Sequence, residues 1–322
     1  MHGQFVWYEL TTPDPDAARR FYPQITGWGT QQYDKDYTMW TSGGVPFAGI
    51  FRPTAEHGPQ GIPPNWMPYI EANNVDETSR LATSLGGKVM VGPKDIPGTG
   101  RFAVLQDPQG ATFGIYKSNT ASQGWDGTPV VGRFSWHELM TTDYQKAFDF
   151  YRRLFGWEKQ SEMDMGGGNM YSMYGKGGKM YGGMFNRTPD MSGMRPFWLC
   201  YINVKDVQKA VDTATKAGAK LQRGPMPVPG GAIAILGDPQ GAAFAVHHVS
   251  ATAAAPKPAA KKAAKTTSQP KAKAAKSRPK AKAGAKKRSP AKKSRAKKAG
   301  ARRSAAKKSA RRPAAKAKRR RR

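Results

Sequence analysis

The sequence predicts an α+β protein made of two tandem, homologous domains and a long basic tail. An internal repeat identifies the domains, because residues 5–14 return with small changes as residues 134–143. The tetrapeptide Asp-Pro-Gln-Gly at 107–110 likewise returns at 238–241. Two copies of one pattern in a chain of this length indicate two domains of ordinary small size.

The tail is evident from its composition. Residues 251–322 contain 30 of the 53 Lys and Arg residues, with no Asp, Glu or aromatic residue. Residues 1–250 are therefore nearly balanced in charge, and the tail carries almost all of the net charge of +31. A segment so poor in apolar side chains cannot bury enough surface to offset its ordering entropy, so we expect it to be disordered when free.

These observations set the expected boundaries. The first domain spans residues 1–118, a linker 119–130, the second domain 131–250 and the tail 251–322. No stretch of about eighteen apolar residues and no leader-like amino terminus occurs, so we expect a cytoplasmic protein without a membrane partner. The single cysteine, Cys200, lies in an apolar run, which favours a buried, inert thiol over a reactive one.

Each domain is predicted to begin with a short strand and a capped helix. Asp14 precedes Pro15, which is typical of an N-cap followed by the first helical residue, and apolar side chains then recur at helical spacing. Asp143 repeats this signal in the second copy. Gly27 and Gly156 are expected to end the two helices.

Strands and a second helix follow in each copy. Glycine-rich hairpins are expected at residues 37–51 and 171–185, and residues 207–214 again have helical periodicity. The Asp-Pro-Gln-Gly segments suit type I turns between the last two strands. Each domain is thus predicted to contain a strand-helix-strands unit twice.

The order of these motifs resembles the vicinal oxygen chelate superfamily, which includes glyoxalase I, extradiol dioxygenases and bleomycin resistance proteins. The pattern is a strand ending at Asp, a helix with Phe-Tyr, then Gly-Trp, and Asp-Pro-x-Gly before the last strand. It is most similar to the tandem glyoxalase-like "hydroxylase" or antigen group. The resemblance covers residues 4–248 and implies two domains, each of two βαβββ modules that form a cup-shaped mixed sheet.

The resemblance also implies where a metal would bind. The family's first-strand His and its last-strand Glu correspond to Trp7 and Gly114 in the first domain and to Trp136 and Ala245 in the second. The remaining ligand positions, aligned less securely, fall at Phe51, Met67, Phe185 and Leu199. These side chains lack the imidazole or carboxylate groups that such ions require, so we expect no metal and no cofactor.

Two histidines lie near the ligand positions, and one of them, His247, leaves a displaced metal site open as an alternative. His137 is one residue away from the ligand position, and the period of a strand directs it to the opposite face. His247 shares the face of Ala245, and with Glu138 it would supply two ligands of the three or four needed. His2, His57 and His248 have no evident partners.

Strand alternation predicts which side chains line the cups. Phe5, Trp7, Glu9 and Thr11 are expected on one concave face, and Phe134, Trp136, Glu138 and Met140 on the other. The next central strands add further polar and aromatic groups, namely Tyr69, Glu71, Tyr201 and Asn203. Aromatic walls with carboxylates suit a planar or cationic organic ligand, although the same residues could simply fill a vacated metal site.

The tail resembles the lysine-rich tails of linker histones and bacterial histone-like proteins. Dense cations without aromatic residues bind phosphates without reading bases, so we expect non-specific nucleic-acid binding and a nucleoid location. The basic clusters expected to contact nucleic acid are Lys261, Lys262, Lys286, Lys287, Arg288, Arg302, Arg303, Arg319, Arg320, Arg321 and Arg322.

Three functions remain open from the sequence. The first is metal-independent binding of a small organic ligand by a protein tethered to DNA. The second is an enzyme of the same fold, a lyase or an oxidoreductase of the dioxygenase type, that uses a displaced metal or none. The third is an architectural nucleoid protein dominated by its tail. The chain is expected to be a monomer with an internal pseudo-dimer, or a homodimer.

Overall fold

The structure is a computed structural model that describes residues 2–54, 62–120 and 128–249. His57, part of the expected linker and the whole basic tail, including the clusters from Lys261 to Arg322, lie outside the described residues. Within the described ranges, no helix is long and apolar enough to cross a membrane.

The first sheet follows the predicted order of strand, helix and strands, twice over. Its elements are β1 (Phe5–Thr11), α1 (Pro15–Thr26), β2 (Gly29–Gln32), β3 (Thr38–Ser42), β4 (Val45–Phe51), β5 (Asn65–Glu71), α2 (Val75–Ser84), β6 (Lys88–Ile96), β7 (Gly100–Gln106) and β8 (Thr112–Ser118). They form an eight-stranded sheet in the order β2-β3-β4-β1-β5-β8-β7-β6.

The second sheet repeats this plan. Its elements are β9 (Phe134–Thr141), α3 (Tyr144–Phe155), β10 (Glu158–Asp164), β11 (Met170–Lys176), β12 (Lys179–Asn186), the 3-10 turn η2 (Pro189–Met191), β13 (Phe197–Asn203), α4 (Val207–Lys216), β14 (Lys220–Val228), β15 (Gly231–Gly237) and β16 (Ala243–Val249). The strand order β10-β11-β12-β9-β13-β16-β15-β14 is the same as in the first sheet.

Each sheet is mixed because it joins two equivalent modules. Within a module the first strand is parallel to the last, as in β1 with β4 and β5 with β8. The two modules meet through the antiparallel pair β1 and β5, or β9 and β13. The predicted pair of βαβββ modules in each domain, and their curled mixed sheet, are therefore confirmed.

The predicted helix signals have the expected geometry. The side chain of Asp14 accepts a hydrogen bond from the backbone N–H of Ala17, and Gly27 ends α1 with a φ of 71°. Asp143 accepts from the N–H of Lys146 in the same way, and Gly156 ends α3 with a φ of 68°. Such caps satisfy N–H groups that the first helical turn leaves without partners.

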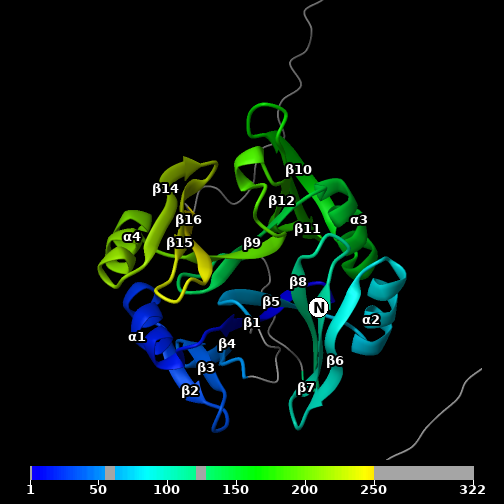
Figure 1. Ribbon diagram of the computed structural model, residues 1–322, viewed down its shortest axis with the longest axis horizontal. Coiled ribbons are helices and arrows are strands. Elements are labelled where there is room, and N and C mark those ends of the chain that lie inside the picture. The colour runs from blue at the N-terminus through cyan, green and yellow to red at the C-terminus, as the bar shows by residue number, and fades with distance from the viewer. Residues whose placement is uncertain (1, 55–61, 121–127, 250–322) are drawn as a thin grey trace, which may run out of the picture. The chain divides into compact units, whose positions relative to one another are not determined.

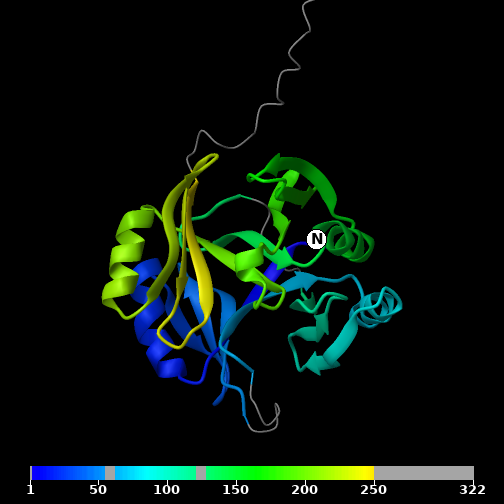
Figure 2. The same cartoon turned by 45° about the horizontal axis from the view of Figure 1, so that its top comes forward.

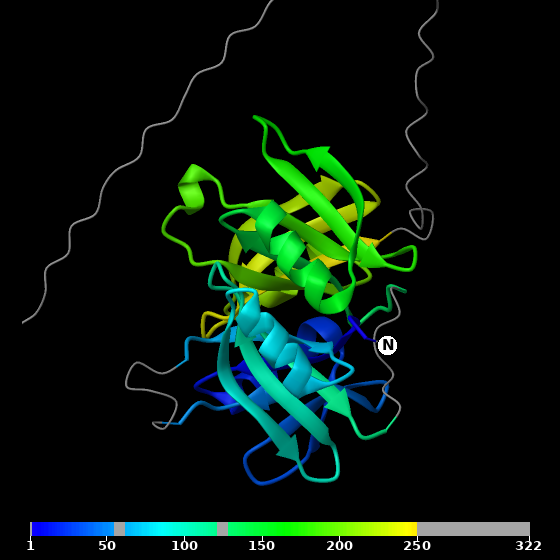
Figure 3. The same cartoon turned by 90° about the vertical axis from the view of Figure 1, so that its right-hand side faces the viewer.

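The two domains pack through their helices and the outer faces of their sheets. Figures 1 and 2 show α1 beside α4, and Figures 1 and 3 show α2 beside α3, so each contact joins the first domain to the second. The Tyr22 hydroxyl donates to Asp238 at 2.9 Å, and the Tyr151 hydroxyl donates to Asp107 at 3.1 Å. One continuous aromatic core therefore spans both domains, and the opposite face of each sheet is left for other contacts.

Candidate functional site: two carboxylate clusters

The first cluster lies on the face of β1 that points away from the helices. We call this face, which carries Trp7, Glu9 and Tyr69, the first cup. Tyr8 and Leu10 point to the other side and belong to the core shared with α1. Trp7 and Glu9 are only partly buried, so solvent reaches this face.

A chain of hydrogen bonds connects these residues. The indole N–H of Trp7 donates to the Tyr37 hydroxyl at 3.1 Å, and that hydroxyl donates to Oε2 of Glu9 at 3.1 Å. The Tyr69 hydroxyl donates to Oε1 of Glu9 at 3.3 Å. All the donors are directed toward the carboxylate, which is the final acceptor of the chain.

The second domain repeats the cluster on the equivalent face, which we call the second cup. The indole of Trp136 donates to the Tyr171 hydroxyl at 2.8 Å, which donates to Oε2 of Glu138 at 2.8 Å. The Tyr201 hydroxyl donates to Oε1 of Glu138 at 3.0 Å. The two domains thus hold the same four side chains, one Trp, one Glu and two Tyr, with the same hydrogen-bond connectivity.

Glycines make room for three of these tyrosines. A Cβ added to Gly49 would lie 1.8 Å from the Tyr37 hydroxyl oxygen, and one added to Gly183 would lie 2.1 Å from Cζ of Tyr171. A Cβ at Gly114 would lie 2.1 Å from Cδ1 of Tyr69. Glycine is required at these positions by the close approach of a ring.

Both carboxyl groups have raised pKa values. Burial raises the pKa of Glu9 to about 6, against the smaller, opposite effect of the hydrogen bonds from Tyr37 and Tyr69. Burial also raises the pKa of Glu138, while hydrogen bonds from Tyr171 and Tyr201 and the charge of Arg223 lower it. A carboxyl with a pKa near neutrality can both accept and release a proton.

The predicted positions of Phe5 and Phe134 in the cups are wrong. Phe5 is fully buried in the core and stacks on His137 with 3.5 Å between ring centroids. Phe134 contacts Tyr8 at 4.2 Å between centroids. The reason is a β-bulge in each strand, between Phe5 and Trp7 in β1 and between Phe134 and Trp136 in β9. Each bulge adds one residue to the strand, which breaks the period of two.

His137 lies on the core side, as strand alternation predicted. Its Nδ1 is 2.9 Å from the carbonyl oxygen of Tyr181, so this nitrogen carries the proton and donates. Its Nε2 lies 2.6 Å from the Tyr8 hydroxyl and accepts from it. Burial lowers the pKa of His137 to about 3, which keeps the ring neutral.

His247 is near the second cup but is engaged elsewhere. Its Nε2 lies 2.5 Å from Oγ of Ser135, and its ring meets the Tyr201 ring edge-on at 5.9 Å between centroids. Burial lowers the pKa of His247 to about 4. Tyr201 therefore contacts both His247 and Glu138, the two groups considered for a displaced metal site.

Glu71 and Asn203 do not join the carboxylate clusters. Glu71 is buried and forms an ion pair of 3.3 Å with Lys117. Asn203 occupies the equivalent position in β13 and is also buried, and its Oδ1 has no hydrogen-bond partner among the described residues. The two cups thus differ at this position.

The residues present do not fit the metal that the resemblance implies. The Trp7 indole nitrogen carries a proton that it donates to Tyr37, so it has no lone pair for a cation. Gly114 has no side chain, and the Tyr69 ring fills the space beside it. In the described ranges, no group of three or more His, Cys, Asp or Glu side chains could hold a metal ion.

Sequence reasoning missed Tyr37 and Tyr171. Both tyrosines begin the glycine-rich hairpins at matched positions of the repeat, and each precedes a matched glycine at position 49 or 183. Comparing the two copies position by position would have shown the pairing of tyrosine with glycine. The placement of Trp7, Glu9 and Tyr69 beside one another, and of Trp136, Glu138 and Tyr201, agrees with the predicted faces; ligand binding by these residues stays a prediction.

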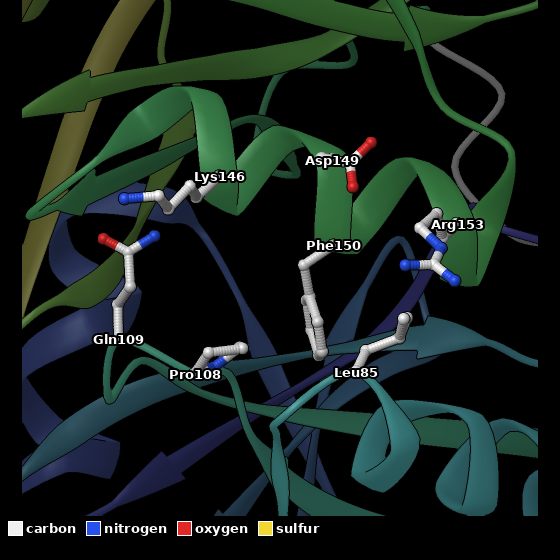
Figure 4. Close-up of a pocket in the computed structure, with 7 residues that line it drawn as sticks. All are labelled: Leu85, Pro108, Gln109, Lys146, Asp149, Phe150 and Arg153. Carbon is white, nitrogen blue, oxygen red and sulfur yellow. The ribbon is translucent and has the colours of Figure 1, made fainter. Parts of the chain in front are cut away.

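A separate pocket of about 300 Å³ lies between the domains. Figure 4 shows Lys146, Asp149, Phe150 and Arg153 on α3 facing Leu85 and the turn at Pro108 and Gln109. Gln109 is already engaged there, because its Oε1 accepts from the Thr141 hydroxyl at 2.9 Å and its amide donates to the Asp143 carbonyl at 2.8 Å. This pocket belongs to the domain interface, away from both carboxylate clusters.

Comparisons with known proteins agree with this architecture. The model of the Glyoxalase/Bleomycin resistance protein/Dioxygenase superfamily matches residues 4–115 and 133–246. "Putative glyoxylase CFP32" of Mycobacterium bovis is 33% identical over 249 residues, which cover 74% of this chain and 92% of the relative. "Anthracycline biosynthesis protein DauV" of Streptomyces sp. strain C5 is 30% identical over 266 residues, which cover 76% and 92%.

Solved structures share the fold at lower identity. The Mn(II)-bound glyoxalase from Novosphingobium aromaticivorans aligns with a TM-score of 0.55 and 14% identity, over 77% of this chain and 82% of that one. A substrate complex of homoprotocatechuate 2,3-dioxygenase from Brevibacterium fuscum aligns with a TM-score of 0.55 and 15% identity, over 76% and 80%.

Proposed function

This chain belongs to the Glyoxalase/Bleomycin resistance protein/Dioxygenase superfamily, and from that premise we propose that its two cups bind small aromatic molecules without a metal. The observation that carries the proposal is the duplicated cluster of Trp, Glu and two Tyr. The domains have diverged at many positions, yet both keep these four side chains and their hydrogen bonds. If the cluster only filled space, bulky side chains would suffice. Both copies also retain a carboxylate on a face that solvent reaches.

The chemistry of the cluster defines the kind of ligand. Each carboxylate oxygen accepts one tyrosine hydroxyl, which leaves further acceptor capacity for a ligand donor. The indole and phenol rings beside it offer flat surfaces for stacking and for a cation. A planar molecule with a hydroxyl, amine or ammonium group fits these requirements, and the name of the DauV relative, anthracycline biosynthesis, is consistent with a polycyclic ligand.

The tail gives the proposal its second part. We propose that residues 251–322, with 30 Lys and Arg residues and no acidic residue, hold the protein on nucleic acid. Their charge density is the support for this proposal, since cations bind phosphates by releasing counterions. The protein would then act in the cytoplasm near the nucleoid.

A thermal-shift screen of the full chain against planar aromatic compounds tests the binding proposal. A compound that binds only the folded state raises the melting temperature by mass action. The shift should shrink in Glu9→Gln or Glu138→Gln, and it should persist in the exposed control Glu77→Gln. Identical shifts in all three variants would place the ligand outside the cups.

A second candidate function is proton transfer on the bound molecule. It is favoured by the pKa of Glu9, raised to about 6 by burial, because a carboxyl titrating near the working pH is an effective general base. Deuterium exchange into acidic C–H positions of a bound compound, followed by NMR, tests it. Exchange should disappear in Glu9→Gln for the first cup or Glu138→Gln for the second, and exchange unaffected by both variants would exclude this role.

A further inference from the structure

Each cup contains the same kind of carboxylate cluster, but the two rims carry their cations at different positions. Arg223 on β14 stands opposite Ile235 of β15, and the equivalent pair in the first domain is Val91 with Val104. Residues directly opposite one another in an antiparallel pair point to the same face. Ile235 packs against the cluster of Leu199, Tyr201 and Ala245 in the second cup, so Arg223 is on this face as well.

The charge of Arg223 acts on the second carboxylate cluster. It contributes to lowering the pKa of Glu138, although burial has the larger and opposite effect, and it also acts on Tyr201. Arg223 is exposed, and no ion pair within 4.0 Å engages it among the described residues. The Arg223 charge also contributes to lowering the pKa of Asp190, which lies in the turn between β12 and β13.

In the first cup no cation acts on the carboxylate in this way. Lys94 shares this face, because it stands opposite Phe102, whose ring contacts Tyr69, but the pKa of Glu9 is set by burial and the two tyrosines alone. Glu9 receives only the two tyrosine hydroxyls, and no basic side chain of the described ranges forms an ion pair with it. Glu71, the carboxylate at the end of β5, forms an ion pair with Lys117, and its counterpart in the second domain is the neutral Asn203. A ligand in the first cup therefore meets a carboxylate on which no basic side chain acts, and a ligand in the second meets a carboxylate on which the Arg223 guanidinium does act.

We infer that the two cups bind different classes of aromatic molecule, and this inference rests on the proposed binding function. The second cup takes an aromatic hydroxy acid, whose hydroxyl donates to Glu138 while its carboxylate pairs with Arg223. The first cup takes an aromatic amine, whose ammonium group pairs with Glu9. Guanidinium binds carboxylate through two parallel N–H donors, which makes Arg223 the residue that determines specificity for the anion.

The test uses the full chain and two fluorescent probes, hydroxynaphthoate and naphthylmethylammonium, in binding titrations. Arg223→Gln should weaken hydroxynaphthoate binding about tenfold or more, because a hydrogen bond between charged groups is lost. Lys209→Gln, which removes one exposed cation from the outer helix α4, is the matched control and should leave the affinity unchanged. The tail is present in every variant, so its attraction for the anionic probe cancels in the comparison.

The first cup is tested in the same way. Glu9→Gln should weaken naphthylmethylammonium binding, Arg223→Gln should not, and Val91→Arg should create a second binding site for hydroxynaphthoate. Trp7→Phe and Trp136→Phe show which cup binds each probe, because only the change in the occupied cup should alter the affinity. If hydroxynaphthoate binds in the second cup with equal affinity to the Arg223→Gln variant and to the wild type, the inference is wrong but the proposed binding function stands. If neither probe responds to a change at Trp7 or Trp136, the proposed binding function fails as well.

Discussion

The hydroxyl of Tyr8 lies 2.6 Å from Nε2 of His137, and this buried hydrogen bond joins the first strand of one domain to the first strand of the other. The His137 ring also stacks on Phe5, so it is held from two sides by the opposite domain. A histidine adjacent to the expected ligand position thus serves the interface between the domains.

Tyr8→Phe should destabilise the protein by about 1–3 kcal/mol, because it leaves a buried ring nitrogen without its donor. Denaturant unfolding measures this change. Tyr33→Phe is the control, since Tyr33 is 46% exposed and the loss of its hydroxyl should lower stability by about 0.5 kcal/mol or less. Equal effects of the two changes would show that the interdomain hydrogen bond contributes nothing.

The close approach of Tyr171 to β12 predicts a cost for any side chain at Gly183. Gly183→Ala should destabilise by about 1–3 kcal/mol, since its methyl group would overlap the Tyr171 ring, and it should displace that hydroxyl from Glu138. Gly193→Ala is the matched control, because nothing lies within 4 Å of a Cβ there. Unfolding curves and ligand titrations of both variants decide whether the ring position matters.

The raised pKa of Glu9 predicts a specific pH dependence of stability. Between the ordinary value of 4.5 and about 6, the folded state binds more protons than the unfolded state, so the contribution of Glu9 to stability falls as the pH rises through this window. His137 and His247, whose pKa values are lowered to about 3 and about 4, act in the opposite direction below their ordinary value of 6.5. Their contribution is common to the wild type and to a variant at Glu9.

Glu9→Gln should therefore gain stability relative to the wild type by about 1–2 kcal/mol between pH 4.5 and pH 7. Unfolding free energies of both proteins at several pH values give the difference. A difference that does not change across this range would mean that burial does not raise the pKa of Glu9.

The tail predicts sequence-independent DNA binding. If residues 251–322 engage about ten phosphates, the logarithm of the affinity should fall with the logarithm of the salt concentration with a slope of about −9. The full chain should bind two unrelated duplexes equally, and a chain ending at Ser250 should bind neither. Retained binding after truncation, or a complex insensitive to salt, would contradict the proposed role of the tail.

Much of the fold was predictable because its signals are local and occur twice. The caps at Asp14 and Asp143, the terminal glycines and the turns at Asp107 and Asp238 each depend on a few neighbouring residues. The repeat then assigned the same topology to both halves. The faces of Trp7 and Glu9 followed from strand alternation.

The remaining features depend on contacts that a single strand does not encode. The bulges that turn Phe5 and Phe134 into the core are set by pairing with the next strand. Tyr37 reaches Glu9 only because Gly49 of the neighbouring strand leaves room for its ring. Arg223 lies far along the chain from Glu138, and only the strand register brings it to the same face.

NMR of the indole N–H groups in the presence of an aromatic probe tests the central claim most directly. The chain has eight tryptophans, and the Trp7 and Trp136 indoles donate to the tyrosines that hold Glu9 and Glu138. On titration with naphthylmethylammonium or hydroxynaphthoate, the Trp7 or Trp136 signal should shift and saturate, while the signals of buried Trp40 and Trp157 should stay in place. Saturable binding that leaves both the Trp7 and the Trp136 signals unmoved would contradict the account.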